Sequence, residues 1–511
     1  MSNDKPNKLD YFAIIMLMLA GATIRLILAS KNSLWLDEQT SLFIASGSFG
    51  DIISGKGFDS HTPPFYYLVL HLWLRALAPL ATSPLFDNAP LFIGSLPTEL
   101  GLRLLSVLID TANIALVFLC ADRIANKRIS RLTTILYACS SYAIYFAAEA
   151  RMYPLLALQC LITLYIALEA RKQLPGPWKL ILLLLVGITG MYTHYYYALF
   201  LAALSIGLML DARFARQLFW RWSGTLFIIA VAFLPWLKVV TTLIGSGGQS
   251  FRKFLFSVPP YTLFRYSAGY GVFPLRWEDK YNLSVSFTNH ATEILLFVIP
   301  FSILSLAGIY RILRYSHYRY TILSCLLLPG LIALAISSKI PMLSERYLIV
   351  SFPLFLLGVA TGTEQTRTFL TKGFLSKGAV IALSLIATSM NFINPLAGFT
   401  QWREATTMLA SRADLTKDKV IVEPEHARGV VLYYLERDHN LILPRKNDSK
   451  TNLNSSTYWL IERLSSTATD KPPVVNGRSA EQSFTFPKEN GLRLSRYEQQ
   501  GRSGNNGLIL R

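Results

Sequence analysis

Long apolar stretches separated by short basic segments dominate the first 394 residues of the chain. A helix that crosses a bilayer needs about 20 mostly apolar residues. Eleven stretches approach that length: 11–29, 102–121, 132–147, 152–170, 179–193, 196–210, 224–240, 291–310, 321–337, 346–362 and 378–394. The pattern therefore predicts a polytopic α-helical membrane protein with about 11 transmembrane helices.

The basic segments predict how these helices are oriented, because lysine and arginine in short loops stay on the cytoplasmic side. With the N-terminus inside, the short loops expected inside carry Arg123, Lys127, Arg128 and Arg131; Arg171, Lys172 and Lys179; Arg213, Arg216 and Arg221; Arg311, Arg314 and Arg319; and Arg367, Lys372 and Lys377. A further apolar stretch, 61–78, would place Lys5 and Lys8 opposite all of them if it crossed the membrane. We expect it to lie in the outer interface as an amphipathic or re-entrant helix.

Two long outer loops, 30–101 and 241–290, follow from this topology, and the chain leaves the membrane on the outer side after residue 394. From there the composition becomes polar, with strand-like runs at 420–422 and 458–461 and a helical stretch at 426–436. We therefore expect a transmembrane catalytic domain, 1–394, and a small extracytoplasmic α/β domain, 395–511.

Composition agrees with a membrane protein, since 52% of the 511 residues are hydrophobic and 16% are charged. A net charge of +18 would suggest nucleic acid in a soluble protein, but here the basic residues follow the topology, so the expected partner is the lipid bilayer and no nucleic acid. Four cysteines, Cys120, Cys139, Cys160 and Cys325, lie in apolar stretches without metal-ligand spacing, and we interpret them as buried apolar side chains.

Adjacent carboxylates, Asp37 and Glu38, follow the first helix on the outer side. Acidic groups at that depth are costly unless they pair or take part in function, although a solvated helix cap would look the same. The second outer motif, His61 to Tyr67, contains two prolines and three aromatic residues. Its tyrosines suit an interfacial anchor, whereas His61 could bind a phosphate or cap the helix.

Three further motifs lie on the outer side, two of them in tight turns and the third at the outer start of a span. They are Glu149-Ala150-Arg151-Met152-Tyr153, Thr193-His194-Tyr195-Tyr196, and Lys339 followed by Glu345-Arg346-Tyr347. Pairing of Glu149 with Arg151, an aromatic belt around His194, and snorkelling of Lys339 and Arg346 to headgroups are the structural interpretations. Substrate contact is the functional one, because all five motifs come out on the same side under a topology set by other residues.

These motifs together resemble the GT-C fold membrane glycosyltransferases, in particular the family 39 group that includes protein O-mannosyltransferases and the lipid A aminoarabinose transferases. The likeness covers most of residues 10–394, and Gln401-Trp402-Arg403 resembles the start of the outer domain in bacterial members. It implies transfer of a hexose or pentose from a polyprenyl-phosphate donor to an acceptor hydroxyl outside the cytoplasm, with inversion, in the cell inner membrane.

The resemblance also implies roles for the residues. Asp37 is then the general base and Glu38 orients the acceptor or Asp37. Cations near the departing phosphate oxygens lower the barrier, and the candidates are Arg346, Lys339 and Arg151. The remaining outer residues are expected to bind substrate: His61, Glu149, Tyr153, His194, Tyr195, Glu345 and Tyr347.

The sequence shows no compact Asp/His cluster, so we expect no cofactor and do not favour a divalent metal. Residues 395–511 do not resemble the β-rich domain of the eukaryotic mannosyltransferases, which favours a glycolipid or polysaccharide acceptor over a protein. A transporter or flippase of lipid-linked saccharides is the main alternative. Such proteins tend to have internal repeats and helices broken at the midplane, and the sequence indicates neither feature. A non-catalytic scaffold is the other alternative, and its activity would not depend on Asp37.

Overall fold

The computed structural model describes residues 8–55, 62–79, 91–93, 96–211, 216–245, 257–272, 284, 288–337, 342–366, 373–393, 401–414, 418–423, 425–439, 458–463, 479–485 and 492–497. Contacts between residues divide the chain into two units. The helical unit comprises Met1–Lys31 and Thr40–Ala397, and the C-terminal unit comprises Asn32–Gln39 and Gly398–Arg511.

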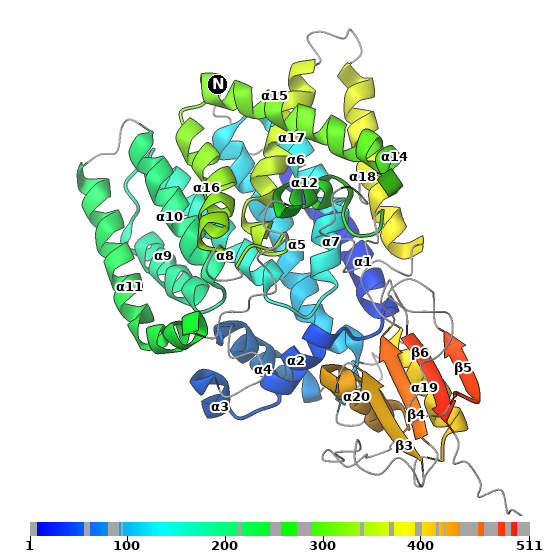
Figure 1. The fold of residues 1–511 in the computed structure, drawn as a ribbon. Coiled ribbons are helices and arrows are strands. Elements are labelled where there is room, and N and C mark those ends of the chain that lie inside the picture. Colours follow the sequence, from blue (N-terminus) through cyan, green and yellow to red (C-terminus); the bar gives the residue numbers. More distant parts are fainter. Residues whose placement is uncertain are drawn as a thin grey trace, which may run out of the picture. The chain divides into compact units, whose positions relative to one another are not determined.

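Helices make up nearly all of the described residues of the helical unit (Figure 1). In chain order they are α1 (Lys8–Lys31), α2 (Leu36–Ala45, whose first four residues belong to the C-terminal unit), α3 (Phe49–Ser54), α4 (Phe65–Leu77), α5 (Glu99–Ile124), α6 (Lys127–Ala138), α7 (Ser141–Ala147), α8 (Tyr153–Ala170), α9 (Pro177–Met191), α10 (Tyr195–Leu210), α11 (Arg216–Gly245), α12 (Val258–Ala268), α14 (Ala291–Glu293), η5 (Ile294–Val298), α15 (Ile299–Tyr315), α16 (Arg319–Ser337), η6 (Tyr347–Val350), α17 (Phe352–Thr366) and α18 (Gly373–Ile393). A two-stranded antiparallel ribbon, β1 (Phe92–Ile93) and β2 (Leu96–Pro97), precedes α5.

Six helical segments within the described residues are long and apolar enough to cross a membrane. They are Asp10–Lys31, Glu99–Ile124, Tyr153–Ala170, Gln217–Thr241, Ala291–Tyr315 and Arg319–Ser337, and four shorter apolar helices accompany them, at Phe65–Leu77, Pro177–Met191, Tyr195–Leu210 and Lys377–Ile393. The prediction of a multi-pass helical membrane protein is confirmed. The count of about 11 spans stays a prediction.

Two of the predicted spans are divided in the structure. The stretch 132–147 breaks after α6, because the Ser140 hydroxyl accepts a hydrogen bond from the Ala143 backbone N–H (3.2 Å) and starts α7. The stretch 346–362 begins as the 3₁₀ turn η6 and continues as α17 beyond Ser351, whose hydroxyl donates to the Cys325 carbonyl (2.8 Å). The Ser140 hydrogen bond is local and competes with a continuous helix, whereas the Ser351 hydrogen bond reaches the neighbouring helix α16, and hydropathy detects neither of them.

Buried polar contacts tie the helices together where they pack. Arg25 of α1 and Asp110 of α5 form an ion pair (2.7 Å) with almost no exposure, and Tyr137 of α6 donates to the same carboxylate (2.7 Å). Ions buried in a membrane protein are stable only when paired in this way. The network joins α1, α5 and α6 into one packed group.

Ion pairs also gather in the segments expected on the cytoplasmic side. Lys127 pairs with Asp122 (2.7 Å), and Glu169 at the end of α8 pairs with both Arg123 and Lys179. Because α8 begins at Tyr153, these pairs lie at the opposite end of that helix from the Glu149–Tyr153 motif. An 18-residue helix is about 27 Å long, close to the thickness of the hydrocarbon core.

The C-terminal unit contains a four-stranded sheet and two longer helices (Figure 1). Its elements are α19 (Trp402–Arg412), β3 (Lys419–Glu423), η7 (Glu425–Ala427), α20 (Arg428–His439), β4 (Tyr458–Arg463), β5 (Gln482–Thr485) and β6 (Leu492–Tyr497). The strand order is β3-β4-β6-β5, with β3 and β4 parallel and the other pairs antiparallel. The predicted small α/β domain is confirmed, and its strand-like runs at 420–422 and 458–461 lie in β3 and β4.

Candidate functional site

Four of the five motifs singled out from the sequence meet at one end of the helical unit. The turn before α10 contacts the start of α4, because the Phe65 N–H donates to the Tyr192 carbonyl (2.9 Å). From the turn before α8, Arg151 donates to the hydroxyls of Tyr67 on α4 (3.4 Å) and Ser41 on α2 (3.3 Å). Residues far apart in sequence therefore converge on the buried Arg151 guanidinium.

The segment before α17 joins the same group. Arg346 donates to the Tyr153 hydroxyl (3.5 Å), and the Tyr347 ring lies 6.3 Å from the Tyr153 ring between centroids. Tyr347 also packs on His194, with centroids 4.6 Å apart. His194 is the N-cap of α10, and its Nδ1 accepts from the Tyr196 N–H (3.2 Å). The tyrosine and histidine rings of the site thus pack on one another where α8, α10 and η6 begin, and His194 caps the start of α10.

Glu345 is completely buried at the centre of the group. Its carboxylate accepts hydrogen bonds from the hydroxyls of Tyr270 (3.3 Å) and Ser344 (3.2 Å), and its backbone carbonyl accepts from the Tyr142 hydroxyl (2.7 Å). Glu149 is buried as well, and its side chain hydrogen-bonds with that of Tyr145. Both acids are thereby supported by tyrosine hydroxyls.

Arg265 of α12 is a site residue that the sequence reasoning missed. Its guanidinium is buried, donates through Nε to the Tyr261 hydroxyl (2.6 Å), and lies 4.1 Å from the centroid of the Tyr270 ring. The Tyr270 ring in turn stacks on Tyr145 with centroids 4.0 Å apart. The sequence feature that could have identified Arg265 is an arginine between aromatic residues in a loop expected outside, as in the other motifs.

A close backbone approach brings this arginine to the site. Gly269, directly after α12, has φ 69°, and a Cβ there would lie 2.0 Å from the Ser141 hydroxyl of α7. The Gly269 carbonyl accepts from Arg265 Nη1 (2.9 Å). Glycine permits both the left-handed conformation and the contact, so residues 265–270 lie directly against the α7 helix.

Charges in the group favour an anion. The group contains three arginines, Arg151, Arg265 and Arg346, and two carboxylates, Glu149 and Glu345, and electrostatic interactions couple Arg265 with Glu345 and both Arg265 and Arg346 with Tyr145. Buried arginines with hydroxyl partners are suited to bidentate binding of phosphate oxygens. The arrangement can therefore hold a phosphate group next to tyrosine rings that could stack on a sugar.

Asp37 and Glu38 lie in the C-terminal unit by their contacts. Asp37 is half-buried in the first turn of α2. Glu38 is fully buried, and its Oε2 accepts from the Trp35 N–H (2.8 Å), as the acid of a capping box does. Glu38 thus stabilises the helix start that carries Asp37.

The other candidates have different surroundings. Tyr195 accepts a hydrogen bond from Trp236 Nε1 of α11 (3.2 Å), which attaches α10 to α11. His61 and Lys339 lie outside the described residues. Within the part of the chain that the structure describes, no group of three or more His, Cys, Asp or Glu side chains is placed to hold a metal ion.

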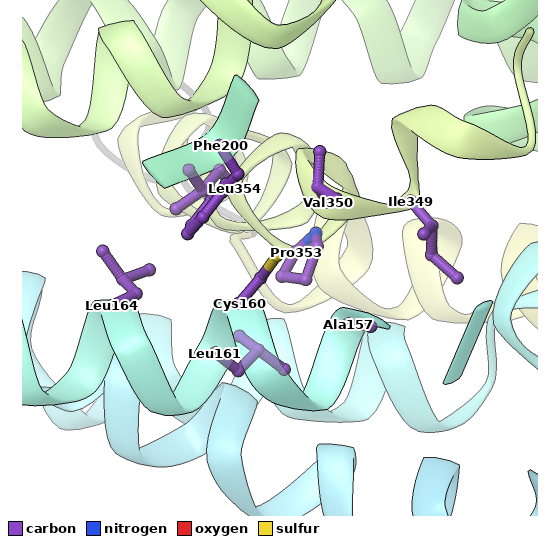
Figure 2. Close-up of a pocket in the computed structure, with 9 residues that line it drawn as sticks. All are labelled: Ala157, Cys160, Leu161, Leu164, Phe200, Ile349, Val350, Pro353 and Leu354. Carbon is purple, nitrogen blue, oxygen red and sulfur yellow. The ribbon is translucent and has the colours of Figure 1, made fainter. Parts of the chain in front are cut away.

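An apolar pocket lies close to the site between α8, α10, η6 and α17 (Figure 2). Figure 2 shows the Cys160 side chain of α8 pointing toward Pro353 of α17, and Leu161, Leu354, Ile349 and Val350 also line the pocket. None of the lining side chains is charged, so the pocket itself cannot bind a phosphate. Two of its lining residues, Ile349 and Val350, belong to η6, so they follow Arg346 and Tyr347 by only a few residues.

Comparisons with known proteins identify the fold. Residues 91–238 match the family model described as dolichyl-phosphate-mannose-protein mannosyltransferase. Curated protein sequences give no significant match. Among solved structures, ArnT from Cupriavidus metallidurans bound to undecaprenyl phosphate matches with a TM-score of 0.54 and 11% identity, over 94% of this chain and 97% of that chain.

A second match is the oligosaccharyltransferase of Archaeoglobus fulgidus in complex with zinc and sulfate, with a TM-score of 0.51 and 13% identity. It covers 83% of this chain, which spans only 61% of that longer chain. The resemblance to GT-C glycosyltransferases is therefore confirmed, and the fold of this multi-pass membrane protein is the GT-C fold.

Proposed function

We propose that this protein, which has the GT-C fold, is a glycosyltransferase that moves a sugar from a polyprenyl-phosphate donor to an acceptor hydroxyl on the extracytoplasmic face of the membrane. The observation that carries the proposal is the group of two buried arginines, Arg151 and Arg265, and the half-buried Arg346, each with a tyrosine hydroxyl as partner. ArnT, similar in fold, is described as bound to undecaprenyl phosphate, which is a donor carrier of the proposed class.

The arginines would stabilise the leaving group. In the transfer, the bond between the anomeric carbon and the phosphate oxygen breaks as the acceptor oxygen bonds to the opposite face of that carbon, with inversion. The electron pair stays on the departing polyprenyl phosphate, whose negative charge grows in the transition state. The Arg265 guanidinium is already buried and oriented by Tyr261, and Arg346 is oriented by Tyr153, so both need little reorganisation to bind that charge.

Asp37 is the base in this proposal. It would take the proton from the acceptor hydroxyl, and a partly desolvated carboxylate at a rigid helix start suits that role. The hydrogen bond from Trp35 to Glu38 makes Glu38 a residue that holds the helix start and Asp37 on it. Glu149, Glu345, Tyr153, His194, Tyr195 and Tyr347 would bind the donor sugar, and the hydrogen bond from Trp236 would hold Tyr195 in place.

A glycolipid or polysaccharide remains the favoured acceptor, because the small α/β unit does not resemble the domain of the protein mannosyltransferases. The inner membrane of a bacterium is the proposed location, with the active site and the C-terminus outside. No step of the proposed mechanism needs a cofactor or a metal ion, and Lys339 and His61 keep their proposed roles in phosphate and substrate binding.

The direct test is release of polyprenyl phosphate from a radiolabelled polyprenyl-phosphate hexose or pentose, with a crude envelope extract as acceptor. Membranes with the parent chain should release it, whereas membranes with equal amounts of Asp37→Asn should lose most of the turnover. Equal release by both proteins would remove Asp37 as the base. No release with any donor would favour the transporter alternative, which an assay of lipid-linked saccharide movement across vesicles would then test.

A further inference from the structure

The segment Asn32–Gln39 lies between α1 and the rest of α2 in sequence, yet it packs as part of the C-terminal unit. Its partners in that unit follow it by more than 360 residues. A connecting segment normally packs on the elements that it joins. The long-range packing of these eight residues therefore requires a specific explanation.

One contact between the Asn32–Gln39 segment and α20 is a buried hydrogen bond. The Leu34 backbone N–H donates to the Tyr434 hydroxyl of α20 (2.5 Å), and both residues are almost completely buried. A buried backbone N–H that loses its acceptor costs about 1–3 kcal/mol. Tyr434 therefore restrains the position of the backbone three residues before Asp37.

Three more contacts hold the flanking residues. Ser33 donates to the Glu404 carboxylate of α19 (3.1 Å) and accepts from the Arg403 N–H (3.3 Å). The Arg463 guanidinium of β4 lies 5.1 Å from the centroid of the Trp35 ring, within cation–π range.

At the other end of the segment, Gln39 packs where α20 has no side chain. A Cβ at Gly429 would lie 2.5 Å from the Gln39 amide group. Contacts from α19, α20 and β4 thus bracket Asp37 and Glu38 on both sides along the chain.

We propose that the C-terminal unit is a positioning device for the acceptor-side carboxylate, and that Tyr434, Glu404 and Arg463 are positioning residues for Asp37. The proposal rests on the function proposed above. A base must be held within about 0.5 Å of its productive position, and the first turn of a helix such as α2, capped by Glu38, still needs packing partners to fix where it lies. Neighbouring secondary structure in the C-terminal unit supplies these partners.

The test compares two adjacent tyrosines of α20. Tyr434→Phe removes the acceptor of the Leu34 N–H, whereas Tyr433→Phe removes a hydroxyl that accepts from Arg437 of the same helix (2.9 Å). In the polyprenyl-phosphate release assay, Tyr434→Phe should lower kcat about tenfold, the effect of roughly one hydrogen bond. The donor KM should stay unchanged, and Tyr433→Phe should keep the kcat of the parent.

Two further variants separate positioning from general damage. Glu404→Gln still accepts from Ser33 and should retain most of the kcat, whereas Glu404→Leu should lower it.

In an Asp37→Asn background, Tyr434→Phe should have no additional effect on the residual rate, because residues that act through one another are not additive. A residue with a merely structural role would lower both rates by the same factor. Membrane abundance and trypsin resistance of the C-terminal unit are matched first.

The outcomes distinguish the two proposals. If Asp37→Asn loses turnover while Tyr434→Phe and Glu404→Leu match their controls, positioning by the C-terminal unit is wrong and the proposed function stands. An equal loss from Tyr434→Phe in both backgrounds also overturns positioning. If Asp37→Asn keeps the rate of the parent, the assignment of Asp37 fails, and the positioning proposal fails with it.

Discussion

Arg265 illustrates how single residues set the chemistry of the site. Removing a guanidinium from water is costly, and here two tyrosines and Glu345 compensate for part of the cost. The geometry of the group is thereby established before any ligand arrives. A phosphate that binds there gains charge-assisted hydrogen bonds without first ordering the side chain.

We expect Arg265→Met to lower kcat/KM for donor release by about 10- to 100-fold, the equivalent of one lost charge-assisted hydrogen bond. Arg265→Lys should fall between Met and the parent, since a lysine keeps the charge but not the planar fork. Arg314→Met is the matched control, because Arg314 is exposed and also donates to a tyrosine hydroxyl, that of Tyr310 (3.1 Å). Equal losses in the Arg265 and Arg314 variants would contradict this role.

At the scale of elements, α15 and α17 pack through glycines. A Cβ at Gly308 would lie 1.9 Å from the Gly358 carbonyl oxygen, and one at Gly362 would lie 1.9 Å from the Leu304 carbonyl oxygen. The two backbones are therefore in direct contact. Small residues allow such close approach in membranes, where packing rather than the hydrophobic effect holds helices together.

Gly308→Leu should accordingly separate α15 from α17 and destabilise the helical unit by at least the roughly 1–3 kcal/mol that overpacking costs. Gly224→Leu serves as the control, because no atom lies within 4 Å of a Cβ placed there on α11. Thermal unfolding in detergent would measure the difference. A similar midpoint for both variants would show that the helices can separate at little cost.

In the C-terminal unit, burial raises the pKa of the Glu462 carboxyl on β4, and Arg493 at 3.5 Å offsets only part of the effect. Because the folded pKa exceeds the unfolded one, the stabilising contribution of this group is complete below the unfolded pKa, about 4.3, and is lost as the pH rises through the folded pKa. We predict that Glu462→Gln gains stability over the parent as the pH rises from about 4 to 7. Pulse proteolysis of the C-terminal unit across that range would reveal it, and parallel curves would argue against it.

At the scale of the whole molecule, the distribution of basic residues predicts the orientation of the helices across the membrane. The basic loops lie at the ends of their helices, and ion pairs such as Lys377 with Glu364 (2.5 Å) occur at those ends. Four of the motifs that the topology places outside contact one another in the structure. The positions of the basic residues and the contacts between the motifs thus agree on which helix ends lie on the same side.

The topology has a direct test in bacterial cells. Alkaline phosphatase, which is active only outside the cytoplasm, should be active when fused after Arg511 and inactive when fused after Lys172. The opposite pattern would invert the assigned orientation and place the arginine group on the cytoplasmic side. Fusion levels are compared on immunoblots so that low activity reflects location rather than abundance.

Much of this protein could be predicted from its sequence because the bilayer imposes a simple rule. Apolar length identifies spanning helices and basic residues orient them, and neither property depends on which helices become neighbours. The polar region after residue 394 likewise carried strand and helix periods of its own, and β3, α20 and β4 lie there. Asp37, Glu149, Glu345 and Arg346 stood out because charges are rare at that depth.

Only the tertiary structure decided which of these residues meet. Arg265 joins the group through the close approach of Gly269 to Ser141, and residues 32–39 pack on α19, α20 and β4 through contacts that span most of the chain. Such contacts depend on shape and on hydrogen bonds between distant segments, which leave no periodicity in the sequence. Hydropathy and charge therefore predicted the helices and an orientation for them, while packing determined the site, because each local pattern is compatible with many partners and the fold selects one.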